Sequence, residues 1–231
     1  VSRLMDSIVR FFPAPNEAAA RAGVNPKDDS EVKRACSADE PFSAQVFKTL
    51  ADAFVGKISL FKVYSGKLTV DTPIYNPTAE KNEKIGSVLY MVGKKTASID
   101  ELVAGDIGAG AKLQYTATGD TLCDPQNPVV FPRIAFTPPA ISMAVTAKKR
   151  GEEDKVFGGL YKLLEEDGTF KVEKSAETGD MLLSGVGEMH LDVICAKLKN
   201  KFNVEAELQD PRIPYRETIK KSAKAQGRHK K

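Results

Sequence analysis

The sequence has no tryptophan, two histidines and only three cysteines among its 231 residues. Cys36, Cys123 and Cys195 lie far apart and lack C-x-x-C spacing, so neither a disulfide framework nor a thiolate metal site is indicated. His190 and His229 are too few to complete a structural zinc site. We therefore expect reduced, buried thiols and no metal.

Long hydrophobic runs are also missing, since no segment approaches the ~18 apolar residues that span a bilayer. Near the N-terminus, Arg3, Asp6 and Arg10 interrupt every candidate core of a signal peptide. The hydrophobic fraction of 42% and the charged fraction of 28% are those of ordinary globular proteins. This composition excludes a membrane protein and predicts a cytoplasmic one.

A strong global charge is absent as well. The formal net charge is +3, but six basic residues crowd into residues 220–231 without an acid, and setting them aside leaves 28 basic against 31 acidic residues. The body is therefore near neutral, so any RNA contact there has to come from a local basic patch. We expect no DNA partner, and the basic tail is either an RNA-binding arm or the opening of a further domain.

The sequence contains no phosphate-binding loop of the form GxxxxGK(S/T). Its Gly-Lys pairs at 56–57, 66–67 and 93–94 lack both the following hydroxyl and the glycine five positions earlier. Glu188 and His190 could be an acid-base pair, but no nucleophile lies at a spacing that would complete a catalytic site. Gly185-Val-Gly187 is better explained as a close strand-helix turn than as a phosphate-binding loop. We predict no catalytic residue and no GTP-binding residue in this chain.

Hydrophobic spacing divides the chain into segments. Leu4, Ile8, Phe11 and Phe12 share one face of a short helix that the following prolines end. Residues 16–39 show no sustained periodicity and are expected to form a linker or an irregular surface segment.

Residues 41–124 alternate short β-branched and aromatic runs with turn signals, which is typical of an all-β domain. Many short strands in about 85 residues indicate a small closed barrel. The expected strands cover residues 42–48, 58–64, 73–75, 84–91 and 106–113.

After Pro138-Pro139 the pattern changes to β-α-β-β-α-β, the order of a ferredoxin-like sandwich. Gly158 and Gly159 fall within its first helix and lower the intrinsic helix propensity there. The chain is thus predicted to be multi-domain, β followed by α+β. The expected divisions are a helix and linker at 1–39, a barrel at 40–126, a linker at 127–138, a sandwich at 139–209 and the start of another unit at 210–231.

Basic residues gather in and beside the expected strand at residues 58–64 of the barrel. Together they would form a phosphate-binding surface that positions the protein on RNA without reading sequence; the alternative is an ordinary solvated lysine face. The candidate contacts are Lys57, Lys62, Tyr64, Ser65 and Lys67 within one predicted hairpin, with Lys94 and Lys95 beside them.

Several segments resemble elongation factor G, in order along nearly the whole chain. DAFVGKISLFKVYSG at 52–66 and TGDTLCD at 118–124 resemble its second domain, and LSGVGEMHLD at 183–192 resembles the strand-helix junction of its third. LMDSIVRFFPAP at 4–15 resembles the last helix of its GTPase domain, and PYRETI at 214–219 resembles the start of its fourth domain.

The resemblance implies the middle portion of a ribosome-dependent translational GTPase, monomeric, whose parent protein binds GTP and Mg²⁺. Its barrel would dock on small-subunit ribosomal RNA and protein, and its third domain would relay between the GTPase centre and the ribosome during translocation or recycling. Two alternatives stay open: a tetracycline-type ribosomal protection protein, and a non-enzymatic RNA-binding adaptor.

Overall fold

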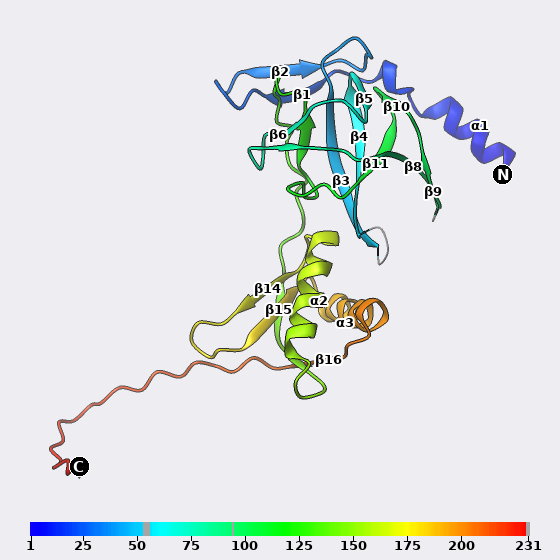
Figure 1. Ribbon diagram of the computed structural model, residues 1–231. Coiled ribbons are helices and arrows are strands. Elements are labelled where there is room, and N and C mark those ends of the chain that lie inside the picture. The colour runs from blue at the N-terminus through cyan, green and yellow to red at the C-terminus, as the bar shows by residue number, and fades with distance from the viewer. Residues whose placement is uncertain (53–55, 94, 230–231) are drawn as a thin grey trace.

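The computed structural model describes residues 1–52, 56–93 and 95–229, which form two domains joined by one extended segment (Figure 1). The first domain consists of antiparallel strands, and the second of two helices packed on a four-stranded sheet. Residues 210–229 extend away from the second domain without helix or strand (Figure 1). Within the described ranges, no helix has the length and apolar character needed to cross a membrane.

The first domain is a curled sheet of eight strands beside a two-stranded ribbon. The eight strands follow the order β7, β6, β12, β3, β4, β11, β8, β9, and the ribbon pairs β5 with β10. All their pairings are antiparallel, as predicted for an all-β domain. Their bounds are β3 (Ser43–Asp52), β4 (Gly56–Ser65), β5 (Lys67–Thr69), β6 (Ile74–Asn76), β7 (Lys81–Glu83), β8 (Val88–Val92), β9 (Lys95–Ser98), β10 (Glu101–Val103), β11 (Ile107–Ala111) and β12 (Thr121–Cys123).

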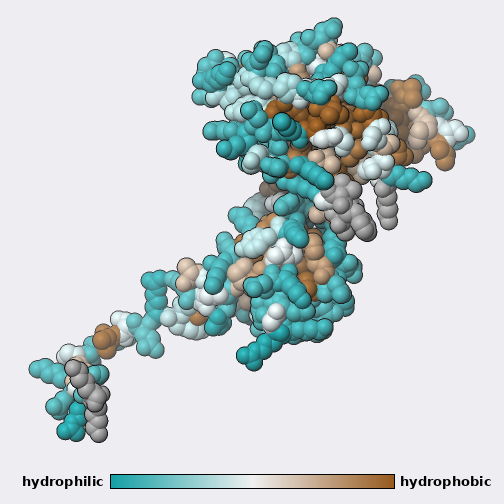
Figure 2. Space-filling view, in the orientation of Figure 1, coloured by the Kyte–Doolittle hydropathy of each residue, from teal (hydrophilic) through white to brown (hydrophobic). Residues whose placement is uncertain are grey.

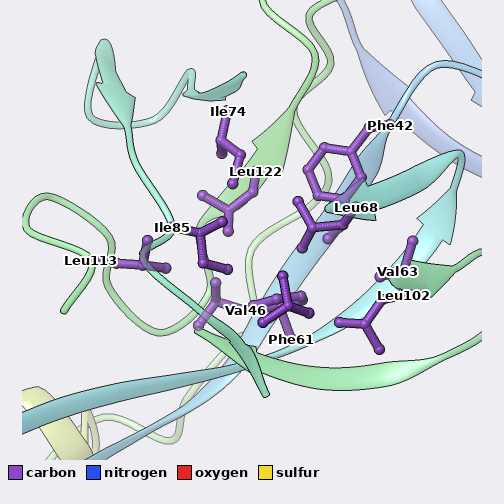
Figure 3. Close-up of a cluster of buried hydrophobic side chains, with 12 residues drawn as sticks. Phe42, Val46, Phe61, Val63, Leu68, Ile74, Ile85, Leu102, Leu113 and Leu122 are labelled. Atoms are coloured by element: carbon purple, nitrogen blue, oxygen red, sulfur yellow. The ribbon is translucent and has the colours of Figure 1, made fainter. Parts of the chain in front are cut away.

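Two-residue alternation along β4 places the core of this domain. Phe61 and Val63 are fully buried, whereas Lys62 is half-exposed on the opposite face. Figure 3 shows Phe61 among buried side chains that come from several strands of the sheet. Leu68 of β5 and Leu102 of β10 belong to the same cluster, so the ribbon closes over the interior of the curled sheet.

Residues 16–39 are not the irregular linker that the sequence predicted. After a short 3-10 helix (Pro15–Glu17), β1 (Arg21–Val24) and β2 (Glu31–Arg34) form an antiparallel hairpin. The N–H groups of Val24 and Val130 each donate to the other residue's carbonyl, at 2.9 and 2.8 Å. The linker prediction was wrong because the residues that order this hairpin lie far along the chain.

Part of the second expected linker, residues 127–138, also belongs to the first domain. Val129 and Phe131 are buried, and they cluster with Cys123 against Tyr64 and Tyr75. Residues 132–138 are exposed and lead to the second domain. The hairpin and this segment together therefore flank the barrel as one structured layer.

The second domain has the predicted β-α-β-β-α-β order, with its strands arranged as β14, β15, β13, β16. Both helices pack on this sheet through one core cluster that includes Leu160, Leu183 and Leu198. The elements are β13 (Ile141–Ala147), α2 (Glu153–Glu166), β14 (Lys171–Lys174), β15 (Met181–Gly185), α3 (Glu188–Phe202) and β16 (Ala206–Gln209).

The two glycines do not interrupt α2, which is continuous through Gly158 and Gly159. A Cβ on Gly159 would lie 2.5 Å from Cδ1 of Leu198 and 3.3 Å from the ring of Phe202, whereas one on Gly158 would meet nothing within 4 Å. Gly159 therefore permits the close approach of α2 and α3, and the lost propensity is offset by packing.

The N-terminal helix α1 (Ser2–Phe11) projects from the first domain (Figure 1). It has no buried residue, and Leu4, Phe11 and Phe12 of its predicted apolar face are 61%, 72% and 70% exposed. Figure 2 shows these apolar colours on α1 near a further apolar region on the visible face of the first domain. The helix was predicted, and its face is uncovered within the described residues.

Candidate functional site

The predicted basic residues do not share one hairpin. β4 pairs with β3 and β11, whereas β5 pairs with β10. The chain turns between β4 and β5 at Gly66, whose φ is +73° and whose Cβ would lie 2.6 Å from the backbone of Phe42. This turn carries β5 into another sheet, so Lys67 lies on a different sheet from Lys57, Lys62 and Tyr64.

Lys62 and Tyr64 remain together on the outward face of β4. The Lys62 ammonium lies 5.7 Å from the centre of the Tyr64 ring, within the range of a cation-π contact. Tyr64 also packs edge-to-face against Phe131, at 5.2 Å between ring centroids. Of the predicted contact residues, Lys62 and Tyr64 are the two that the structure brings into contact on an outward face.

Ser65 lies on the opposite face and is fully buried. Its hydroxyl donates to the carbonyl of Pro41 at 2.6 Å and lies 2.6 Å from the Ser43 hydroxyl. Both bonds lie inside the barrel, so Ser65 is a structural hydroxyl, and the expectation of a surface contact does not fit its position.

Lys57 faces the second domain. Its ammonium lies 3.9 Å from a carboxylate oxygen of Glu165, at the end of α2, and its side chain is 23% exposed. The adjoining Glu166 accepts a hydrogen bond from the backbone N–H of Ala51 at 2.6 Å. Lys57 therefore takes part in the contact between the domains.

Lys67 and Lys95 are exposed on two other strands. Lys67 lies opposite Val103 in the β5–β10 ribbon, and its ammonium is 3.9 Å from a carboxylate oxygen of Glu101, diagonally across the ribbon. Lys95 begins the edge strand β9. Lys94 lies outside the described residues.

Two arginines of the N-terminal flank, which the sequence reasoning missed, stand close to Tyr64. The guanidinium carbon of Arg21 lies 5.2 Å from the centre of the Tyr64 ring and 5.9 Å from that of Phe131. Arg34 is 8% exposed and lines the same cavity as Lys62 and Tyr64. The only signal for Arg21 and Arg34 was their positive charge, because the hairpin that positions them was taken for a linker.

The junction between β15 and α3 is a close turn, as predicted. A Cβ on Gly185 would lie 2.6 Å from Cδ2 of Leu191, so this strand-helix approach requires glycine. Nδ1 of His190 accepts the backbone N–H of Val186 at 3.2 Å, and its Nε2 lies 3.5 Å from a carboxylate oxygen of Asp167.

Asp167 fixes the turn after α2. Burial raises the pKa of this carboxylate, but hydrogen bonds from Thr169 and then the neighbouring His190 outweigh it, so the net pKa is lowered. The side-chain hydroxyl and the backbone N–H of Thr169 both donate to one Asp167 oxygen, at 2.5 and 3.0 Å. Asp167, Thr169 and His190 therefore tie the end of α2 to the start of α3.

The thiols of Cys36, Cys123 and Cys195 are unpaired, and burial raises the pKa of Cys123 to about 11. In the part of the chain that the structure describes, no group of three or more His, Cys, Asp or Glu side chains is placed to hold a metal ion.

A curled antiparallel barrel followed by a βαββαβ sandwich is the domain arrangement of a translation factor. Residues 41–125 match the family described as elongation factor G domain 2, and residues 136–210 match the family described as Elongation Factor G, domain III. The chain thus belongs to the elongation factor G family.

A solved structure agrees with this assignment over most of the chain. The crystal structure of a protein from Thermus thermophilus superposes on this chain with a TM-score of 0.75. The two sequences are 30% identical. The similarity covers 95% of this chain and 30% of that one, so the chain spans less than a third of the length of the protein it resembles.

Proposed function

We propose that this chain is the ribosome-binding central portion of an elongation factor G-like translational GTPase that acts in translocation or ribosome recycling in the cytoplasm. The parent protein would bind GTP and Mg²⁺ through a separate GTPase domain and would act as a monomer. The barrel contacts small-subunit ribosomal RNA and protein, and the second domain relays between the GTPase centre and the ribosome. The family membership of both domains supports this assignment.

The single observation that carries the RNA contact is the outward-facing pair Lys62 and Tyr64. A lysine ammonium held against an aromatic ring on a rigid central strand presents fixed positive charge, which suits the phosphate backbone. No carboxylate of the described residues pairs with Lys62, so its charge is available. Lys67 and Lys95 extend the proposed surface, Lys57 contributes at the domain boundary, and Ser65 is left out because it is buried.

Co-sedimentation with purified small ribosomal subunits across a salt series tests this proposal. We expect binding that weakens with salt, and a Lys62→Glu variant that binds more weakly and shows a salt slope smaller by about one. Lys81→Glu, at an exposed position on β7, provides a matched change of charge. Equal binding of the Lys62→Glu and wild-type chains would remove Lys62 from the contact, and no binding at low salt would contradict the proposal as a whole.

A further inference from the structure

A cavity of about 300 Å³ lies between the N-terminal flank and the outward face of β4. In Figure 1 the flank crosses the end of the barrel. The residues that line the cavity therefore come from segments far apart in sequence. Arg21, Arg34 and Cys36 line one wall, and Lys62, Tyr64 and the Gly105 turn line the other.

Positive charge is concentrated around one ring in this cavity. The Arg21 guanidinium carbon and the Lys62 ammonium lie 5.2 and 5.7 Å from the centre of the Tyr64 ring. The ring attracts both cations, but it does not neutralise either of them. Both cations line the same cavity, and this positive charge favours an anion within it.

Two guanidinium groups also have unused donors. Nη2 of Arg34 donates to the carbonyl of Asn127 at 2.7 Å, and Nη2 of Arg21 donates to Oε1 of Gln45 at 3.3 Å. The Nε–H groups of both arginines are buried without an acceptor. An unpaired buried donor on a charged group is costly, and the native fold tolerates few of them.

The nearby acids do not cancel this charge. Nη1 of Arg34 lies 3.7 Å from a carboxylate oxygen of Glu40, which is the one ion pair made by the pocket cations within the described ranges. The Asp106 carboxylate, beside the Gly105 turn, accepts the backbone N–H of Val103 at 2.9 Å. Three cations thus face one carboxylate in a cavity large enough for a tetrahedral oxyanion.

We propose that this pocket binds one phosphate group of an RNA backbone. The guanidinium groups of Arg21 and Arg34 donate to its oxygens, Lys62 supplies additional charge, and Tyr64 forms the side of the pocket. Guanidinium donors match the geometry of a phosphate, and such a contact fixes position without reading sequence. This inference rests on the function proposed above and extends the contact to two arginines of the N-terminal flank.

The first test is a titration of the 231-residue chain with inorganic phosphate. NMR chemical shifts of the backbone amides and of the arginine side chains report the binding. Chloride at equal ionic strength is the reference. We expect saturable shifts confined to Arg21, Arg34 and the last residues of β4, around Lys62 and Tyr64. Shifts that are absent, or that chloride reproduces, would overturn the pocket.

Variants then assign the binding to these side chains. Arg21→Gln and Lys62→Gln should each weaken phosphate binding by about tenfold, as expected when one charged hydrogen-bond donor is lost. Lys81→Gln, at an exposed position on β7, should leave the phosphate affinity unchanged. If Arg21→Gln fails to fold, Lys62→Gln still decides, because the half-exposed Lys62 side chain lies outside the core cluster.

Binding of small ribosomal subunits distinguishes a backbone phosphate from free phosphate. We expect Arg21→Gln to weaken co-sedimentation and added phosphate to compete with it. If the wild-type chain binds subunits and Arg21→Gln binds them equally well, the inference is overturned while the proposed function stands. If phosphate binds but the wild-type chain binds no subunits, the proposed function and the RNA source both fail, and only a free-phosphate site remains.

Discussion

Glu166 and Ala51 join the two domains: the last residue of α2 accepts the backbone N–H of a β3 residue at 2.6 Å. The same carboxylate lies 2.5 Å from the ammonium of Lys201, and the Glu166 side chain is 10% exposed. Because the carboxylate is largely withdrawn from water and has charged and neutral donors on two sides, it fixes where α2 meets the barrel.

Glu166→Gln is therefore expected to loosen the domain contact by about 1–2 kcal/mol, since it weakens a charge-assisted hydrogen bond. Both domains should stay folded, and NMR relaxation should report more independent tumbling of the two. Glu165→Gln is the matched control. The ion pair between Glu165 and Lys57 spans 3.9 Å and Glu165 is half-exposed, so this pair contributes little to the stability of the domain contact. Identical relaxation of the two variants would contradict a special role for Glu166.

The adjacent glycines of α2 give a second prediction. Gly159→Ala should destabilise the second domain by about 1–3 kcal/mol, because the new methyl group would collide with Leu198. Gly158→Ala should stabilise it by about 0.5–1 kcal/mol, since its position is open and alanine favours a helix. Denaturant unfolding of both variants measures the difference, and a shift of the same sign in both would refute the packing argument.

Glu205 gives a third prediction, on acid stability. Hydrogen bonds and charges of Lys199 and then Lys148, at 2.6 and 3.0 Å, lower its pKa from 4.5 to about 2. Because the folded pKa is the lower one, this carboxylate stabilises the fold above pH 4.5, and the stabilisation is lost as the pH falls towards 2.

The Glu205→Gln variant should therefore lose less stability than the wild-type chain between those two pH values. Glu207→Gln on β16 keeps the same chemistry at an exposed position and serves as the control. Acid unfolding followed by circular dichroism provides the measurement. If the Glu205→Gln variant and the wild-type chain lose the same stability as the pH falls, Glu205 makes no such contribution.

The second domain was predictable because its signals are local. Leu191, Ile194 and Leu198 recur at helical spacing on α3, and all three are buried. Element order and fold class could be predicted because they depend on the spacing of residues that are close together in the sequence.

The candidate site was less predictable because it depends on which faces and segments meet. Ser65 has the same parity as the buried Phe61 and Val63, so its inward position could have been inferred from the alternation along β4. The approach of Arg21 to Tyr64, by contrast, depends on pairing between Val24 and Val130, for which a single sequence carries no signal. The same holds for Lys57, whose partner Glu165 belongs to another domain.

The pairing of Val24 with Val130 also sets how the first domain can be cut for expression. A recombinant piece limited to residues 41–125 would remove both the hairpin and Phe131, which cover Tyr64 and Cys123. The bared aromatic and thiol side chains would make such a piece prone to self-association and oxidation in the test tube. A well-behaved single domain has to begin before Arg21 and end after Phe131.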